Sequence, residues 1–272
     1  MAQKIMLSLA VFFCWTFVLK AEEYKLSSPD KKLEVKLRVE GRTEFEVWYD
    51  KVKLVEPSVI GMNLSDGCHV GGDPVTSVKK DRVNRKIDVV AGKNKTLKEA
   101  YNEIVLSYGT DYDLVVRAYN EGWAYRFVTH WDKEIIINSE DAVFNFAECD
   151  SNTAPEREQS GKVHQIHQGY RNFERLYKVY RSPGEIPAGR FSVSPVLFEY
   201  PGKPYKVVVT ESDTYDYPGL YMEAAGQNAM RGKWASYPKE VMDGDPSNPY
   251  RWYSNHLVIS REDYIARTGG DR

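Results

Sequence analysis

Apolar and polar residues alternate with a period of two through much of the first half of the chain. In residues 33–39 (LEVKLRV) the leucines and valines fall on one face of an extended segment, and the charged residues fall on the other. Residues 40–42 supply a turn into residues 45–49, so these segments are predicted to pair as a β-hairpin. A second hairpin is predicted from residues 114–119 and 123–128, which the turn sequence NEG connects.

The strand pattern recurs in residues 52–55, 59–64 and 104–108, with Pro57 between the first two segments. No window carries the sustained apolar repeat of about 3.6 residues that an amphipathic helix requires. Only short helical turns are expected, for example at Ser139–Asp141. Many short strands separated by turn signals predict an all-β fold, a β-sandwich of antiparallel strands with few short helices.

The N-terminus has the pattern of a secretion signal. Lys4 precedes an apolar run from Ile5 to Leu19, which is shorter than the roughly twenty residues of a membrane span. Cleavage after Ala21 is therefore predicted, with residues 1–21 as the signal peptide and no membrane association after cleavage. The expected location is the periplasm, reached by export across the inner membrane. An uncleaved anchor is the alternative reading of the same segment.

The net charge of the chain bears on the kind of partner that it can bind. A formal net charge of −2 argues against a nucleic-acid partner, because such proteins usually carry a clear basic excess. The basic cluster Lys79–Arg82 is interrupted by an acid and is expected in a solvated loop.

After the signal peptide, Cys68 and Cys149 are the two remaining cysteines. A single disulfide between them and two separate buried thiols both remain open.

The segment 205–222 (YKVVVTESDTYDYPGLYM) carries the most distinctive candidate chemistry. The β-branched run Val207–Val209 predicts a buried strand, and Glu211 follows at its exit. A carboxylate there, beside further acids and tyrosines, is typical of a surface that binds a hard cation or a sugar. A tyrosine-rich turn without a ligand is the competing interpretation.

Four segments in order resemble glycoside hydrolase family 97, which includes α-glucosidases and α-galactosidases of the Bacteroidetes type. Segment 205–222 is similar to the TEA-x-x-x-DYPGMYL-like stretch near the end of the family's N-terminal β domain. Residues 27–35 (SSPDKKLEV) resemble its SPDGKL-x-V opening, and residues 56–62 (EPSVIGM) resemble its EPSxLGL strand. Residues 117–127 (RAYNEGWAYRF) are similar to its RAYNDGVAFRY hairpin.

The resemblance implies that residues 22–272 form the N-terminal β-supersandwich domain of such an enzyme. The catalytic (β/α)8 barrel and its oligosaccharide site would lie in a C-terminal partner domain that these residues do not include. No residue of this chain is therefore predicted to be catalytic. The resemblance also implies that the domain contributes one ligand, matched here by Glu211, to a calcium ion at the rim of the active site.

Two other classes of function remain compatible with the sequence. A stand-alone carbohydrate-binding module would account for the tyrosines and the signal peptide without a barrel. A purely structural sandwich of a surface glycan-capture system is the other alternative. The irregular, Pro- and Gly-rich stretch 148–189 favours a neighbouring domain, because such long loops are uncommon in a compact domain unless another part covers them.

Overall fold

The computed structural model describes residues 21–109, 111–147, 162–164, 178–212, 214–215, 217–243 and 256–268. Within them the chain is built from antiparallel strands, and its one helical element is a 3-10 turn, η1 (Pro183–Glu185). The strands are β1 (Glu22–Ser27), β2 (Leu33–Val39), β3 (Thr43–Tyr49), β4 (Val52–Leu64), β5 (His69–Val70), β6 (Ser77–Asp88), β7 (Thr96–Tyr108), β8 (Tyr112–Ala118), β9 (Trp123–Thr129), β10 (Ile135–Phe146), β11 (Lys162–His164), β12 (Val179–Tyr180), β13 (Phe191–Val193), β14 (Val196–Glu199), β15 (Lys206–Val209), β16 (Tyr221–Ala224), β17 (Ala229–Lys233), β18 (Pro238–Asp243), β19 (His256–Arg261) and β20 (Ala266–Thr268). The predicted all-β class is confirmed.

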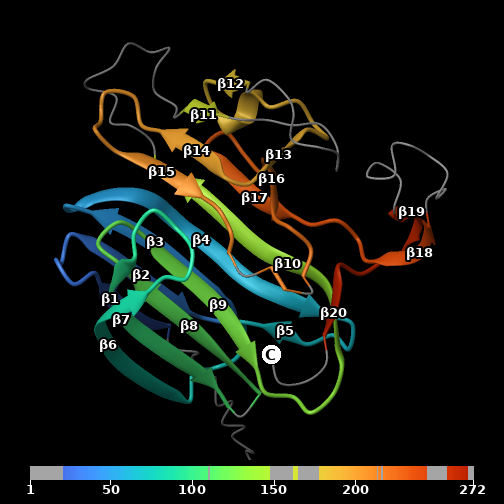
Figure 1. Ribbon diagram of the computed structural model, residues 1–272, viewed down its shortest axis with the longest axis horizontal. Helices are drawn as coiled ribbons and strands as arrows, with labels where there is room; N and C mark the ends of the chain where they lie inside the picture. The colour runs from blue at the N-terminus through green and yellow to red at the C-terminus, as the bar shows by residue number, and fades with distance from the viewer. Residues whose placement is uncertain are drawn as a thin grey trace, which may run out of the picture.

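Figure 1 shows a large sheet with smaller sheets arranged around it. The ten-stranded sheet runs in the order β1-β2-β3-β4-β10-β17-β16-β13, with β5 added to β4 and β20 added to β10. A four-stranded sheet, β6-β7-β8-β9, packs on one side of it, and a second four-stranded sheet, β12-β11-β14-β15, lies near its other end. Strands β18 and β19 form a separate hairpin. The packed sheets confirm the predicted sandwich.

The two predicted hairpins are present. Strands β2 and β3 pair from Leu33↔Tyr49 to Val39↔Thr43, and β8 pairs with β9 through residues 112–129. In β2 and β8 every second residue is buried, as the alternation of apolar residues requires for a strand with one face on a core.

Two local predictions were wrong. Ser139–Asp141 is not a helical turn but part of the continuous strand β10, where it pairs with residues 61–63 of β4. The interruption expected at Pro57 is also absent, because β4 continues through it from Val52 to Leu64. Pro57 falls at an irregularity in the pairing of β3 with β4, the kind of position where a strand tolerates a residue that has no N–H.

The core between the ten-stranded sheet and β6–β9 is aromatic. Phe45 of β3 and Trp123 of β9 meet with ring centroids 4.6 Å apart. Tyr108 stacks on Tyr112 with centroids 4.7 Å apart, and its hydroxyl lies 2.9 Å from Thr43 Oγ1 of the facing sheet. These contacts fix the two sheets against each other through both apolar burial and buried hydrogen bonds.

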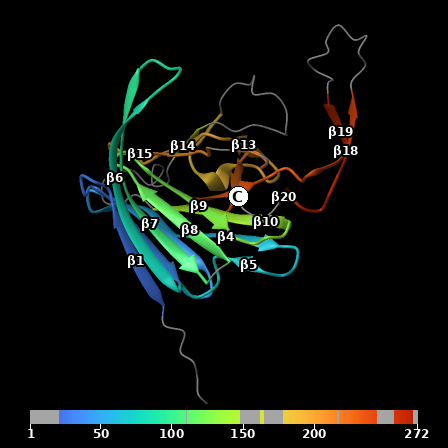
Figure 2. The ribbon, with the colours of Figure 1, turned by 60° about the horizontal axis from the view of Figure 1, so that its bottom comes forward.

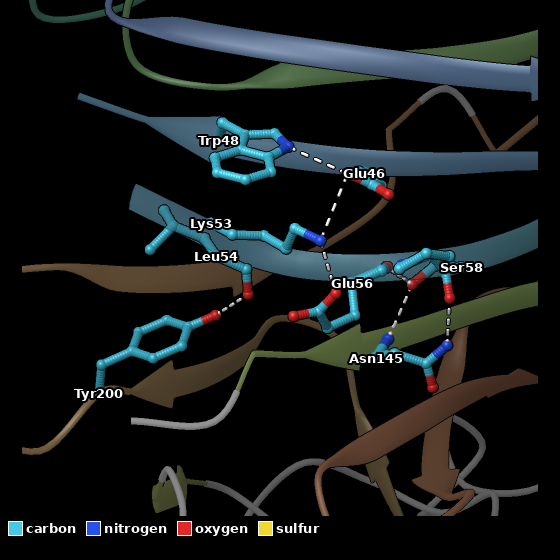
Figure 3. Close-up of polar contacts among 9 residues, drawn as sticks. Glu46, Trp48, Lys53, Leu54, Glu56, Ser58, Asn145 and Tyr200 are labelled. Carbon is cyan, nitrogen blue, oxygen red and sulfur yellow. Dashed lines mark hydrogen bonds and ion pairs between the residues drawn. The ribbon is translucent and has the colours of Figure 1, made fainter. Parts of the chain in front are cut away.

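A second junction joins β11–β15 to the large sheet. The rings of Phe146 and Phe198, both buried, stack with centroids 4.0 Å apart. The hydroxyl of Tyr200 donates to the carbonyl of Leu54. Figure 3 shows this bond beside the polar contacts by which Asn145 ties β10 to β4: its backbone N–H donates to Ser58 Oγ over 2.9 Å, and Nδ2 donates to the carbonyl of Pro57 over 2.6 Å.

Lys79–Arg82 does not lie in a loop, contrary to the prediction. It belongs to β6, which pairs with β7 over twelve registered positions from Ser77↔Ser107 to Asp88↔Thr96. Nearly every residue of β6 is exposed. Figure 2 shows this hairpin extending beyond the rest of its sheet.

Other sequence predictions fall outside the described residues. This holds for the signal peptide except Ala21, for Cys149, and for most of the stretch 148–189. Cys68 is half-buried. In the described part of the chain, no helix has the length and apolar character needed to span a membrane.

Candidate functional site

Glu211 lies directly after β15, as the sequence predicted. The strand itself is less buried than expected: Val209 is buried, but Val208 is 56% exposed. Glu211 Oε1 accepts a hydrogen bond from the backbone N–H of Leu220 over 2.6 Å, and the Ser194 hydroxyl lies 3.4 Å from the same oxygen. The side chain therefore closes the segment 211–220 into a loop and has a defined orientation.

The environment of Glu211 disfavours its charged form. Partial burial raises the pKa of its carboxyl group, and the two hydrogen bonds offset this only in part. Within the described residues the carboxylate forms no ion pair, and Oε2 accepts no hydrogen bond. Among the described residues, one carboxylate oxygen is thus held by the backbone while the other has no hydrogen-bond partner.

Glu140 is a second carboxylate at this site, and the sequence did not indicate it. It projects from β10, and the hydroxyl of Tyr217 donates to its Oε2 over 2.8 Å. The pKa of Glu140 is raised from 4.5 to about 7, mainly by burial and to a smaller extent by the nearby charges of Glu211 and Asp141, against the effect of the Tyr217 bond. At neutral pH this group can hold a proton that an ordinary surface glutamate would have lost.

The tyrosines of the 205–222 segment have different roles. The ring of Tyr205 contacts Tyr49 edge to face with centroids 5.7 Å apart, and Tyr221 contacts Phe191 in the same way at 5.3 Å. Tyr217 is half-buried on Glu140, whereas Tyr215 is 86% exposed. Of the rings in this segment, only that of Tyr215 is presented freely to a ligand or a neighbouring domain.

The described residues of this site supply few of the ligands that a calcium ion needs. Calcium takes about six to eight oxygen ligands. Among the residues that the structure describes, no group of three or more His, Cys, Asp or Glu side chains could hold a metal ion. Asp213 and Asp216, which flank Tyr215, lie outside those residues. The open Oε2 of Glu211 fits one ligand position, and the rest of a coordination shell would have to come from elsewhere.

Comparison with protein families identifies the family of this chain. Residues 26–253 match the family model described as Glycosyl-hydrolase 97 N-terminal. The chain belongs to this family. The match includes all four segments on which the resemblance was based, so the identification made from the sequence is confirmed.

Relatives of this family 97 N-terminal domain are longer proteins. It is 27% identical over 273 aligned residues to a retaining α-galactosidase of Bacteroides thetaiotaomicron, an alignment that covers 99% of this chain and 40% of the relative. The domain therefore spans about two fifths of that relative's length.

Solved structures share its fold. A family 97 glycoside hydrolase from Pseudoalteromonas sp. strain K8 in complex with panose superposes with a TM-score of 0.69 at 12% identity, covering 91% of this chain and 34% of that one. A β-arabinopyranosidase superposes with a TM-score of 0.61 at 19% identity, covering 77% and 35%. In both, the matched part is about a third of a larger protein.

Proposed function

We propose that this chain is the N-terminal domain of a secreted α-glycoside hydrolase of the α-glucosidase or α-galactosidase type. In this proposal the domain is exported to the periplasm, braces a C-terminal (β/α)8 barrel and shapes the barrel's oligosaccharide site. The observation that carries the proposal is the family match over residues 26–253, together with a relative that is an α-galactosidase.

Glu211 is the residue through which the domain would act on the site. It would donate Oε2 to a calcium ion whose other ligands come from the barrel and from water. The bond from Leu220 N–H to Oε1 already restrains the carboxylate, so that binding a cation through Oε2 would cost little further side-chain entropy. When bound, a calcium ion would supply positive charge that polarises and orients the oxygens of a sugar at the active-site rim.

A catalytic role for this chain alone is not proposed. Glycoside hydrolysis requires one carboxyl group to protonate the leaving oxygen and a second to act as base or nucleophile, on opposite sides of the scissile bond. Glu140 and Glu211 are instead engaged by Tyr217 and by Leu220 of the same loop. Their contacts stabilise the loop, and the catalytic pair is assigned to the barrel.

The sequence downstream of codon 272 is the first test: an in-frame barrel supports the proposal, and a stop codon contradicts it. In the full-length enzyme, Glu211→Gln is expected to raise the calcium concentration needed for half-maximal activity by tenfold or more, on the order of one lost charged ligand. Glu121→Gln, at an exposed turn, serves as the matched control. An unchanged calcium requirement in Glu211→Gln would rule out the ligand role.

The alternative, a stand-alone carbohydrate-binding module, requires exposed aromatic platforms. Within the described residues, Tyr215 is the one aromatic side chain exposed by more than a third. Trp48 is not free for stacking on a sugar, because the ammonium groups of Lys36 and Lys53 lie 4.3 and 5.0 Å from its ring centroid. Figure 3 shows Lys53 beside this ring. Glycan binding by the purified chain that is lost in Tyr215→Ala would favour the module.

A further inference from the structure

The hairpin formed by β6 and β7 projects beyond its sheet. Strand β8 pairs with β7 only from Asn102 to Tyr108, while β6 pairs with β7 as far as Asp88↔Thr96. The part of the hairpin beyond Asn102 therefore has no third strand, and it stands away from the rest of the molecule in Figure 2. Residues 77–100, which comprise this projecting part and the preceding residues of β6 that pair with Asn102–Ser107 of β7, are called the basic arm below.

The charge of the basic arm is opposite to that of the whole chain. It carries eight Lys and Arg against three Asp and Glu, a net charge of +5, whereas the complete chain has −2. Within the described structure, only Arg85 of these eight cations forms an ion pair, with Glu99. The other seven are Lys79, Lys80, Arg82, Lys86, Lys93, Lys95 and Lys98.

The pairing of the arm places like charges together. Lys86 and Lys98 are direct cross-strand partners, an arrangement that destabilises a sheet because the two ammonium groups repel each other. No acid of the described chain compensates this pair by an ion pair. An anionic surface bound to the arm would remove the repulsion.

The tip of the arm is apolar as well as basic. Ile87 and Leu97 are cross-strand partners, exposed by 39% and 48%, and Val90 in the connecting turn is fully exposed. Lysine on an edge strand can be explained as protection against aggregation, but exposed apolar side chains at the tip work against that purpose. The combination has to be explained by a partner that accepts both charge and apolar surface.

We propose that the basic arm docks the protein on the surface of an anionic lipid bilayer. The lysines would contact phosphate headgroups, while Val90, Ile87 and Leu97 enter the boundary between headgroups and acyl chains. Basic residues gain electrostatic attraction at such a surface, and apolar side chains gain from burial in it. A soluble polyanion would use only the charges, so the apolar tip favours the bilayer.

The test is vesicle co-sedimentation of residues 22–272, which lack the apolar leader that would itself bind lipid. Binding is expected to vesicles of phosphatidylcholine mixed with phosphatidylglycerol, not to pure phosphatidylcholine, and to weaken as salt is raised. The triple variant Lys93→Glu, Lys95→Glu, Lys98→Glu is expected to bind at least about tenfold more weakly, since each lysine contributes to the attraction. Val90→Asn, which removes apolar surface without changing the charge, is expected to weaken vesicle binding but not binding to heparin.

The matched control carries the same charge change elsewhere, at Lys32, Lys178 and Lys239, all exposed and outside the arm. It is expected to bind vesicles like the wild type. All variants alter exposed positions, and circular dichroism with thermal unfolding confirms that each has folded. Failure of the wild type to bind phosphatidylglycerol vesicles at low salt would overturn the proposal. Equal loss of binding in the control triple variant would also overturn it. So would unchanged vesicle binding in Val90→Asn, in this case in favour of a soluble polyanion.

Discussion

Tyr217 donates its hydroxyl hydrogen to Glu140 Oε2 over 2.8 Å, and so attaches the loop that follows Glu211 to strand β10 of the large sheet. The same loop is closed at its ends by the bond from Leu220 N–H to Glu211 Oε1. Two glutamates that are 71 positions apart in the sequence thus anchor one loop. Both have a raised pKa, so the loop is coupled to pH.

Stability is expected to fall as pH rises through the titration of Glu140. Its pKa is about 7 in the folded chain and 4.5 ordinarily. Between these values the folded state holds a proton that the unfolded state has released, so rising pH favours unfolding. Glu140→Gln, which stays neutral, should match the wild type below pH 4.5 and exceed its free energy of unfolding by about 1–3 kcal/mol above pH 7. Urea denaturation across this pH range measures the difference.

Tyr217→Phe is expected to lower the free energy of unfolding near neutral pH, whereas Glu140→Gln raises it. The Tyr217 bond lowers the pKa of Glu140, so its loss should raise that pKa and extend the pH-dependent loss of stability to higher pH. Glu121→Gln, at an exposed turn, should leave the pH profile unchanged. Superimposable profiles for the wild type and Glu140→Gln would contradict the assignment.

Calcium binding by the isolated chain should be weak. One glutamate leaves most of the coordination shell to water, so the dissociation constant is expected at about millimolar or above. Titration calorimetry with residues 22–272 measures it. Tight binding that survived Glu211→Ala would show that the ion has another, complete site.

Residues 22–272 alone should not hydrolyse p-nitrophenyl α-glucoside or α-galactoside. The two carboxyl groups that glycoside hydrolysis requires are assigned to the barrel, and they account for many orders of magnitude of rate. The measurement is the release of p-nitrophenol from each glycoside, with and without calcium. Turnover that depends on calcium and persists after repeated purification would place the catalytic residues in this chain.

The stacked pair Phe146–Phe198 should dominate the junction between β11–β15 and the large sheet. Phe198→Ala removes a buried ring and leaves a cavity, with an expected loss of about 3–5 kcal/mol in the free energy of unfolding. Phe198→Leu should cost less because it refills part of the volume. Val208→Ala, on the neighbouring strand and 56% exposed, should change stability by less than about 0.5 kcal/mol. Equal losses in Phe198→Ala and Val208→Ala would refute the packing argument.

Two buried tyrosines that stack on each other should differ in their hydrogen-bond contributions. The Tyr112 hydroxyl accepts from Gly71 N–H and donates to Asp73 Oδ2, each over 2.9 Å. Tyr112→Phe leaves the Gly71 donor unpaired and should cost about 1–3 kcal/mol. Tyr108→Phe should cost less, because Thr43 Oγ1 still donates to the carbonyl of Gly71. Chemical denaturation of the two variants in parallel decides whether this order holds.

The sequence predicted those parts of the fold in which one face of a strand is buried. Strands β2, β3, β8 and β9 alternate apolar and polar residues, and this pattern is what pairing against a core produces. Strand β6 has no buried face, so it carries no alternation, and its lysines indicated a loop instead. Secondary structure without burial leaves little trace in hydrophobic patterning.

Only one of the two glutamates of the candidate site could be predicted from the sequence. Glu211 could be found because a distinctive local motif surrounds it. Glu140 could not, since its raised pKa results mainly from burial, and both this burial and the contact with Tyr217 arise only in the tertiary fold. The acidic pair Glu140–Asp141 between the apolar segments of β10 was the one available signal, and it was interpreted as a helical turn.

The pairing partners of strand β10 come from distant parts of the chain. Its first residues pair with β20, so Ile135–Ile137 find their partners only in residues 266–268, while its other edge is occupied by β4. During synthesis the β2–β3 hairpin can form early, but this edge of β10 stays open until residues 266–268 have been made. A nascent chain would therefore expose an unpaired hydrophobic strand edge over the interval between the synthesis of β10 and that of β20.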